Sequence, residues 1–495
     1  MSFNAVLAAA LNRPTDPEAL AALADAALQE GEEERALALL ADAVAKAPTA
    51  RLWQWKGLLE RSLDEHEKAL GSLHEAARLD PSDARVAHGL ARVALESGTP
   101  AEALFERALR LAPSDGAALL GLAAARLAAG RGDQARAELD ALLSQSPLWV
   151  EGHMQLAQLQ SMLGHSELAS SSLDRALAGL PGQGRLWQAL LELHVKRDDF
   201  DALADAVERA RKGGAGTAML RQYEAIAASE LGRTELADTL FAQCEAAGDK
   251  GLAIWIIRHL LRSGRPQRAS TVIDRELAGP RAADVWPYAA IAWRQTGDPR
   301  WDWLYRDGTL VSVGDLTAGL PALKRLAEVL RSVHAAKGQY LDQSVRGGTQ
   351  TDGPLFSRIE PEIRALRAAI VEAVQRYVVA LPPPDPGHPL LRHRRDRRVR
   401  FSGSWSVRLK AQGYHVSHVH PQGWISSALY IAVPDEADQP DSNAGWLQLG
   451  EPPPGIGGGL KPLELVKPES ARLVLFPSWL WHGTLPFAEG ERLTV

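Results

Sequence analysis

Four histidines near the end of the chain have the type and spacing of metal ligands. His415, His418 and His420 occur in the segment GYHVSHVHP, and His482 follows in SWLWHGTLP. Alternate residues of a β-strand face the same side, so a strand here would project His418 and His420 together. A third imidazole from a distant strand would complete one face of a coordination shell. The spacing therefore predicts a metal site at His418, His420 and His482.

Several alternatives to this ligand set stay open. Iron can be held by three imidazoles, but zinc also favours that set. His418 and His482 could bind alone, with water in the third place, and His415 could substitute if the strand register differs. The histidines could also simply pack or cap loops.

The elements that must position these histidines are predicted to be short antiparallel strands. After Arg400, four segments are rich in β-branched and aromatic residues and are separated by Gly, Pro, Asp and Asn: FSGSWSVRL, ISSALYIAV, GWLQLG and ARLVLFPSW. This density of strands predicts a sandwich or a double-stranded β-helix of the jelly-roll type. Helical patterning over 316–334 and 360–379 predicts flanking helices, whereas the prolines of LPPPDPGHP (381–389) exclude a regular helix.

Taken together, four segments resemble the iron(II)- and 2-oxoglutarate-dependent oxygenases. They are DQSVRGGTQT (342–351), GSWSVRL, HVHPQGWISSALY and LFPSWLWHGTLP. The resemblance covers about residues 300–495 and is greatest to the prolyl-hydroxylase-like branch and to bacterial members that follow tetratricopeptide repeats. It implies an Fe(II) cofactor, 2-oxoglutarate and O₂ as co-substrates, and hydroxylation of a C–H bond. No catalytic residue beyond the metal centre is predicted.

The resemblance also assigns roles to individual residues. The family pattern of H-x-D/E, a distant H and then R falls on His418, His420, His482 and Arg492. Arg492 would grip the far carboxylate of 2-oxoglutarate, Tyr430 would donate its hydroxyl to that carboxylate, and Thr494 would lie beside it.

One departure from the family pattern concerns charge. His420 stands where the family usually has a carboxylate, and three neutral imidazoles leave the full +2 charge on the metal. That charge should change the redox behaviour of the metal and its grip on the anionic co-substrate. Arg346 and Gln350, in the loop QSVRGGTQT, suit substrate contact, although a plain loop fits equally well. The chain stops at Val495, inside the strand that carries Arg492, so we expect a C-terminal truncation.

The first part of the chain repeats with a period near 34 residues. Short turns are followed five residues later by an alanine, at steps of 32 to 35 residues: Ala36, Ala69, Ala103, Ala135, Ala169, Ala204, Ala237 and Ala269. Glycine permits a tight turn between two helices, and a small alanine lets them approach closely. Proline ends a unit, and the marker prolines are Pro48, Pro81, Pro113, Pro147 and Pro181. This pattern resembles the tetratricopeptide repeat (TPR) over about residues 17–290.

Such a solenoid usually binds a peptide or another protein on its concave face. We therefore expect a protein or peptide partner on the TPR face. Five tryptophans could be binding anchors or could pack between repeats: Trp53, Trp55, Trp149, Trp187 and Trp255.

Composition excludes several other classes of protein. The 495 residues carry a net charge of −6, which gives no reason to expect nucleic acid as a partner, although six arginines in RHRRDRRVR could form a phosphate-binding patch or pair with acids. The single cysteine, Cys244, excludes an intrachain disulfide framework and is expected in the core. Without a signal peptide or a long apolar segment, the chain is expected to be cytoplasmic, with no membrane span.

The sequence thus predicts an α+β multidomain protein. Its parts are a TPR-like α-solenoid of about eight repeats (1–297), a helical and loop lead-in (298–400) and a double-stranded β-helix core (401–495). The predicted function is an Fe(II)/2-oxoglutarate-dependent dioxygenase that hydroxylates a protein or peptide side chain presented by the repeats. The alternative is a non-catalytic adaptor whose β-domain is a degenerate or structural metal-binding module.

Overall fold

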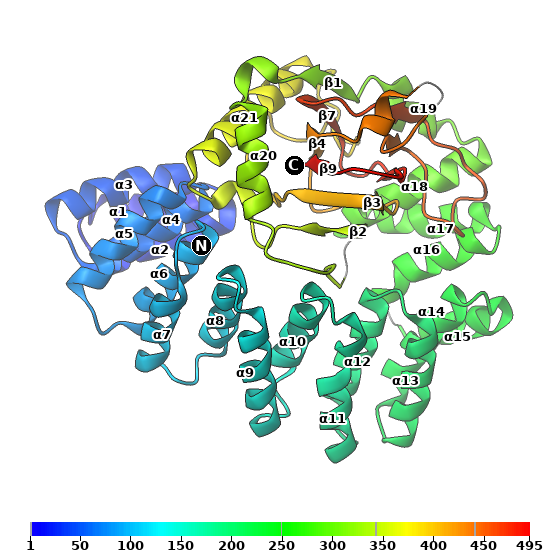
Figure 1. Cartoon of the computed structure of the whole chain (residues 1–495), viewed down its shortest axis with the longest axis horizontal. Coiled ribbons are helices and arrows are strands. Elements are labelled where there is room, and N and C mark those ends of the chain that lie inside the picture. Colours follow the sequence, from blue (N-terminus) through cyan, green and yellow to red (C-terminus); the bar gives the residue numbers. More distant parts are fainter. Residues whose placement is uncertain (1, 249, 342–343, 440–441) are drawn as a thin grey trace. The chain divides into compact units, whose positions relative to one another are not determined.

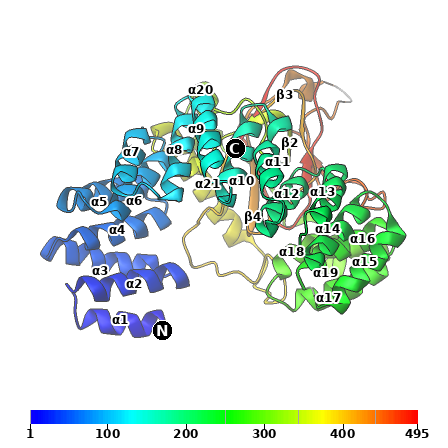
Figure 2. The same ribbon diagram turned by 90° about the horizontal axis from the view of Figure 1, so that it is seen from below.

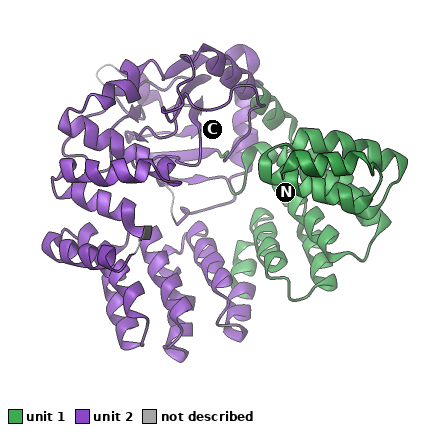
Figure 3. Cartoon of the chain, turned by 180° about the vertical axis from the view of Figure 1, so that it is seen from behind, with its two compact units in different colours: residues 1–137, 352–368, 403–405 green, residues 138–351, 369–402, 406–495 purple. Residues whose placement is uncertain are grey.

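The computed structural model describes residues 2–248, 250–341, 344–439 and 442–495. Helices occupy most of the chain up to Tyr305, and strands with a few helices follow (Figure 1). The chain forms two compact units (Figure 3): unit 1 is residues 1–137, 352–368 and 403–405, and unit 2 is residues 138–351, 369–402 and 406–495. The domain limits expected from the sequence, at residues 297 and 400, stay a prediction.

The helical part alternates between first and second helices of a hairpin, after an initial helix α1 (Phe3–Leu11). The first helices are α2 (Pro17–Glu30), α4 (Ala50–Ser62), α6 (Ala84–Glu96), α8 (Gly116–Ala128), α10 (Val150–Met162), α12 (Gly184–Lys196), α14 (Thr217–Glu230), α16 (Ala253–Arg262) and α18 (Ala282–Thr296). The second helices are α3 (Glu33–Lys46), α5 (His66–Leu79), α7 (Glu102–Leu111), α9 (Gly132–Gln145), α11 (Ser171–Gly179), α13 (Phe200–Lys212), α15 (Thr234–Ala246) and α17 (Pro266–Leu277). In unit 2, helices from α10 to α18 pack in chain order (Figure 2).

The sequence marks of the repeat have a clear structural basis. Each hairpin turn contains a residue with positive φ, such as Gly31 at 70°, and each marker proline lies two residues beyond a second helix, as Pro48 does after α3. Six of the eight marker alanines are buried, which explains why a small residue recurs at this position where the paired helices pack. Two are not: Ala103 is exposed and Ala204 is half-buried.

Both exceptions have a local cause. Helix α7 begins at Glu102, four residues after Gly98 rather than two, and this shift moves Ala103 off the buried face. In the other turn the left-handed residue is Asp198, with φ 53°, so the residue five positions later is Leu203, which is fully buried.

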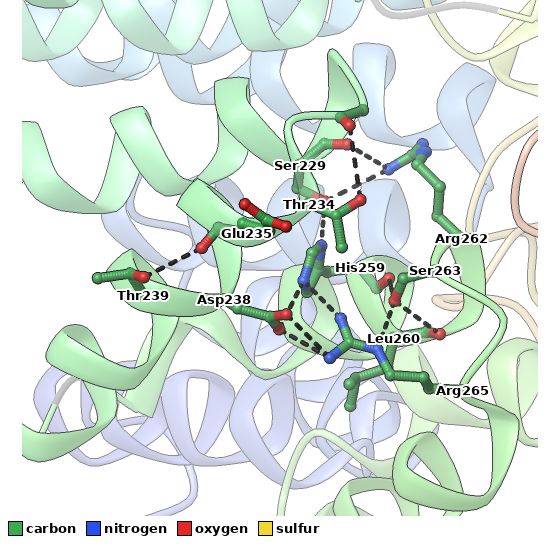
Figure 4. A network of polar contacts seen from close by, with 11 residues as sticks. Ser229, Thr234, Glu235, Asp238, Thr239, His259, Leu260, Arg262, Ser263 and Arg265 are labelled. Atoms are coloured by element: carbon green, nitrogen blue, oxygen red, sulfur yellow. Dashed lines mark hydrogen bonds and ion pairs between the residues drawn. The ribbon is translucent and has the colours of Figure 1, made fainter.

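Buried polar contacts join successive repeats in unit 2. His259 of α16 lies 3.1 Å from Ser229 Oγ of α14 and 3.1 Å from Asp238 Oδ1 of α15, and Arg265 also binds Asp238 (Figure 4). Burial lowers the pKa of His259, so the ring is neutral in this network. Cys244 of α15 is buried, as expected.

The tryptophans of the repeats differ in exposure. Trp187 is buried, and its Nε1 donates to Pro181 O at 2.7 Å, so it packs within the helical part. The other four, including Trp255, are half-buried.

The second half of the chain forms two antiparallel sheets. The larger has the order β1-β7-β4-β9-β3-β2 and the smaller has the order β6-β5-β8. The strands are β1 (Ser312–Asp315), β2 (Val345–Gln350), β3 (Val407–His415), β4 (Ile425–Ala432), β5 (Leu447–Leu449), β6 (Glu464–Val466), β7 (Arg472–Pro477), β8 (His482–Thr484) and β9 (Arg492–Thr494). The helices of this part are α19 (Arg300–Tyr305), α20 (Leu323–Ser332) and α21 (Pro361–Ala380).

The structure confirms an N-terminal helical solenoid followed by a strand-rich part. The two flanking helices expected near 316–334 and 360–379 correspond to α20 and α21, and no helix is described within 381–389. The expectation of a loop at residues 345–350 is wrong, because this segment pairs with β3 as strand β2.

The strands of unit 2 share their core with the repeat helices. Trp481 Nε1 donates to the carbonyl of Pro287 in α18 at 2.9 Å, and the rings of Trp481 and Tyr288 meet edge to face at 5.7 Å. Arg294 of α18 donates to the carbonyl oxygens of Gly450 and Lys461. One hydrophobic cluster therefore runs from the repeats into the sheets.

Surface features bear on the remaining expectations from the sequence. In the basic run, Arg394 pairs with Asp396, and Arg395 donates to the carbonyls of Leu381 and Pro382. Among the described helices, none combines the length and apolar composition that crossing a bilayer requires. The cytoplasmic location stays a prediction.

Candidate metal centre

Backbone pairing brings the histidines together. The expectation that His418 and His420 lie on one strand is wrong, because β3 ends at His415 and both residues lie in the following segment. His418 instead forms an isolated bridge with His482 of β8: His418 N donates to His482 O at 2.9 Å, and His482 N donates to His418 O at 3.0 Å. His420 N donates to Ser478 O at 3.1 Å. These hydrogen bonds hold the backbones of His418, His420 and His482 close together.

The three predicted ligands form a compact group. One ring nitrogen from each of His418, His420 and His482 lies within 4.8 Å of the other two. The centroids of the His418 and His482 rings are 4.2 Å apart. His418 and His420 are half-buried and His482 is buried, so solvent reaches the group from the side of the first two. Three imidazoles in this arrangement fit a single transition-metal ion.

Hydrogen bonds to backbone carbonyls determine which ring nitrogen is protonated in His418 and in His482. His418 Nδ1 lies 2.8 Å from Val416 O, and His482 Nδ1 lies 3.0 Å from Leu480 O. A carbonyl can only accept, so Nδ1 carries the proton in both rings and Nε2 keeps its lone pair. Such a bond to the second ring nitrogen is usual for metal-binding histidines and fixes the tautomer and the ring orientation.

Burial keeps these rings neutral. It lowers the pKa of His418 to about 4, and, together with the charge of His418, lowers the pKa of His420 to about 3. The pKa of His482 is held well below its usual value for the same reasons. At neutral pH each of the three rings therefore has one unprotonated nitrogen, and the donor set fits the metal that the sequence suggests.

A second polar group, here called the anion cradle, consists of Arg492, Tyr430 and Thr494. All three are buried, with exposed fractions of 2%, 0% and 8%. The guanidinium carbon of Arg492 lies 5.0 Å from the centre of the Tyr430 ring. Among the described residues, none forms a hydrogen bond with Arg492 Nε, Arg492 Nη1 or the Tyr430 hydroxyl.

The anion cradle lies on one face of the larger sheet, and the histidine group packs against that same face through Phe476. Thr494 lies opposite Tyr430, and along β4 the residues Tyr430, Ala428 and Ser426 face the same side. Ser426 lies opposite Phe476, whose ring meets that of His482 at 4.8 Å. Arg492 also contributes, after burial and His418, to holding the pKa of His415 well below its usual range.

Arg346 and Gln350 were expected to contact substrate. Both lie on strand β2, but their surroundings differ. Gln350 lies opposite Val407, which lies opposite Thr494, so Gln350 shares the face of the anion cradle. Arg346 lies 4.0 Å from Asp198, at the turn between α12 and α13. Asp342 and Gln343, which precede this strand, lie outside the described residues.

Ser344 is a site residue that the sequence did not indicate. Its Oγ lies 3.0 Å from His415 Nδ1 and 3.2 Å from His418 Nε2. His415 itself is not part of the three-histidine group, although its ring stacks on that of His418 at 5.7 Å. Only the pairing of β2 with β3 brings Ser344 here, so no local spacing could have revealed it.

Two family models match this chain. Residues 403–495 match the family described as "Putative 2OG-Fe(II) oxygenase", and residues 99–160 match the tetratricopeptide repeat. One part of the chain is therefore similar to TPR repeats and another part to this oxygenase family. This confirms the two resemblances stated from the sequence, and the family implies Fe(II) and 2-oxoglutarate. A comparison with curated proteins gives no match.

Several crystal structures of TPR proteins are similar to part of the chain. One from Parabacteroides merdae is 17% identical, covering 45% of this chain and 89% of its own, with a TM-score of 0.33. YrrB, described as a TPR protein with an unusual peptide-binding site, is 20% identical over 38% and 98%, with a TM-score of 0.29. Yeast Tom70 is 13% identical over 58% and 62%, with a TM-score of 0.36. With TM-scores this low, these structures support no conclusion about the function of this chain.

Proposed function

We propose that this chain is an Fe(II)- and 2-oxoglutarate-dependent dioxygenase. The proposed iron ligands are His418, His420 and His482. The anion cradle, Arg492 with Tyr430 and Thr494, would bind the distal carboxylate of 2-oxoglutarate. When bound, the iron supplies the activation of O₂ that hydroxylation of a C–H bond requires. The family match over residues 403–495 supports this class of reaction.

The observation that carries the proposal is the buried cation in the cradle. Two guanidinium nitrogens of Arg492 and the Tyr430 hydroxyl are buried without hydrogen-bond partners among the described residues. Leaving such a charge uncompensated costs several kcal/mol. A carboxylate that accepts two parallel bonds from the guanidinium and a third from the tyrosine would satisfy this group.

The two sites together select a molecule with two different ends. The cradle takes a carboxylate, and the three neutral imidazoles leave the full positive charge of the metal available to an anionic chelating group. Both groups lie on one face of the sheet, since Phe476 of that face contacts His482. A short dicarboxylic oxoacid such as 2-oxoglutarate fits both requirements.

The substrate in this proposal is a protein or peptide side chain presented by the repeats. The match of residues 99–160 to TPR repeats and the Arg346–Asp198 contact between β2 and the repeats of unit 2 support it. The proposal also takes the two antiparallel sheets as a double-stranded β-helix. The alternative of a non-catalytic adaptor is not favoured, because both the histidine group and the anion cradle are present.

A binding measurement with Arg492→Met tests this assignment. Calorimetric titration of the Fe(II)-loaded chain with 2-oxoglutarate under nitrogen should show binding that the substitution weakens by about 100-fold, because a charged bidentate pair is lost. Arg472→Met is the matched control, since Arg472 lies in the same sheet on β7, which β4 separates from β9, and its guanidinium pairs with Glu469. Equal affinity for 2-oxoglutarate in both variants would contradict the proposed role of the cradle.

A further inference from the structure

A short chain of hydrogen bonds reaches the nitrogen through which His418 would bind metal. It begins at His415, passes through the hydroxyl of Ser344, and ends at His418 Nε2. Ser344 is buried, with 9% of its surface exposed, and Val416 N donates to Ser344 O at 2.9 Å. The hydroxyl is thus held in place by the pairing of β2 with the end of β3.

The direction of each bond in this chain follows from its first member. Because His418 Nδ1 donates to Val416 O, His418 Nε2 can only accept, and the Ser344 hydroxyl must be the donor. The Ser344 oxygen then accepts from His415 Nδ1. His415 is therefore a donor toward Ser344, and its role in this arrangement is to orient the hydroxyl toward His418.

The same lone pair of His418 cannot both accept this hydrogen bond and bind a metal ion. We propose that Ser344, oriented by His415, is a positioning residue that competes with the metal for His418 Nε2 and so lowers the metal affinity of the site. This inference rests on the proposed function, because it takes His418 as a ligand. It also assigns His415 to the support of Ser344 rather than to the ligand set.

Titration with Co²⁺ tests this competition without any need for turnover. The metal affinity of the full chain would be measured against a chromogenic chelator, with the visible absorption of bound Co²⁺ as a second readout. Removing the competing bond in Ser344→Ala should tighten Co²⁺ binding about two- to tenfold, the range expected for one net hydrogen bond. Ser344→Thr keeps the hydroxyl and should bind Co²⁺ with the affinity of the wild type.

Two further variants separate this role from simpler explanations. Ser406→Ala is the matched control, because Ser406 is also a buried serine that contacts a histidine nitrogen, His334 Nε2 at 3.2 Å, but lies away from the histidine group. It should leave the Co²⁺ affinity unchanged. His415→Phe should tighten Co²⁺ binding in the same direction as Ser344→Ala, whereas a metal ligand at this position would give the opposite result.

These outcomes distinguish failure of this inference from failure of the proposed function. Unchanged or weaker Co²⁺ binding in Ser344→Ala, in a chain whose wild type binds Co²⁺ and whose His418→Ala variant does not, overturns the competition alone. Loss of Co²⁺ binding in His415→Phe overturns the assignment of His415. Absence of Co²⁺ binding in the wild type overturns both this inference and the proposed iron site.

Discussion

At the scale of single residues, burial decides the chemistry of the site. It keeps the imidazoles of His418 and His420 neutral, so that each ring has one unprotonated nitrogen. It also makes Arg492 a cation that lacks a partner for two of its nitrogens among the described residues. The proposal of a metal together with an anionic co-substrate rests on these neutral donors and on this uncompensated cation.

His334 gives a prediction for the pH dependence of the free energy of unfolding. Burial, and then the charge of Arg408, lower the pKa of His334 to about 4, while its ring contacts Thr349 and Ser406. The unfolded chain therefore takes up the proton first, and the stability contributed by neutral His334 is complete above about pH 6.5 and is lost as the pH falls toward 4.

The measurement is urea unfolding of the wild type and of His334→Gln at pH 7 and pH 5. Glutamine can keep hydrogen bonds to the two hydroxyls but does not titrate. We expect the fall in unfolding free energy between the two pH values to be smaller in the variant by about 1–2 kcal/mol. An equal fall in both proteins would show that His334 is not responsible.

At the scale of elements, the turns between paired helices hold later segments of the chain. In unit 1, Asp64 occupies a left-handed turn position, with φ 59°, and lies 3.5 Å from Arg367 of α21. In unit 2, the carbonyl of Met162, next to a turn, accepts from the backbone N–H groups of Lys337 and Gly338, both at 2.8 Å. The turns therefore serve as attachment points as well as connections between helices.

Strand β8 offers a second prediction. A Cβ atom on Gly483 would lie 2.9 Å from His415 O and 3.3 Å from Ser417 Cα, because β8 passes close to the segment that leads to His418. Gly483→Ala should lower the unfolding free energy by about 1–3 kcal/mol and weaken metal binding by pushing His482 away from His418.

Thermal unfolding and Co²⁺ titration would measure both effects. Gly314→Ala is the control, because Gly314 lies on the edge strand β1 and its Cβ would meet no atom within 4 Å. If Gly483→Ala matched this control in stability and in metal affinity, the close approach of β8 would not matter.

The elements also show what sequence reasoning can reach. The 34-residue period predicted the helical pairs, which is a local signal. The family pattern singled out His418, His420 and His482, which the structure does bring together, although not by the shared strand that the spacing predicted. The strand β2 was missed because its glycines resemble a loop, and Ser344 was missed because its partner His418 is 74 residues away. Contacts set by strand pairing leave no mark in local spacing.

At the scale of the whole molecule, the proposed catalytic part of unit 2 is not separable from the repeats that precede it. Residues of α10 to α18 and of β4, β5 and β7 belong to one hydrophobic cluster. The proposed ligand His482 directly follows Trp481, which contacts Pro287 and Tyr288 of α18. The repeats of this unit therefore support the histidine group, and the full chain is the proper material for functional tests.

The most direct test of the central claim is an anaerobic titration of the full chain with Fe(II) and 2-oxoglutarate. The visible charge-transfer band of the iron–oxoacid chelate would be followed in the wild type and in His418→Ala. We predict a saturable band in the wild type that is absent from the variant. No band in the wild type, with metal analysis showing zinc or no metal, would contradict the assignment of the chain as a 2-oxoglutarate-dependent oxygenase.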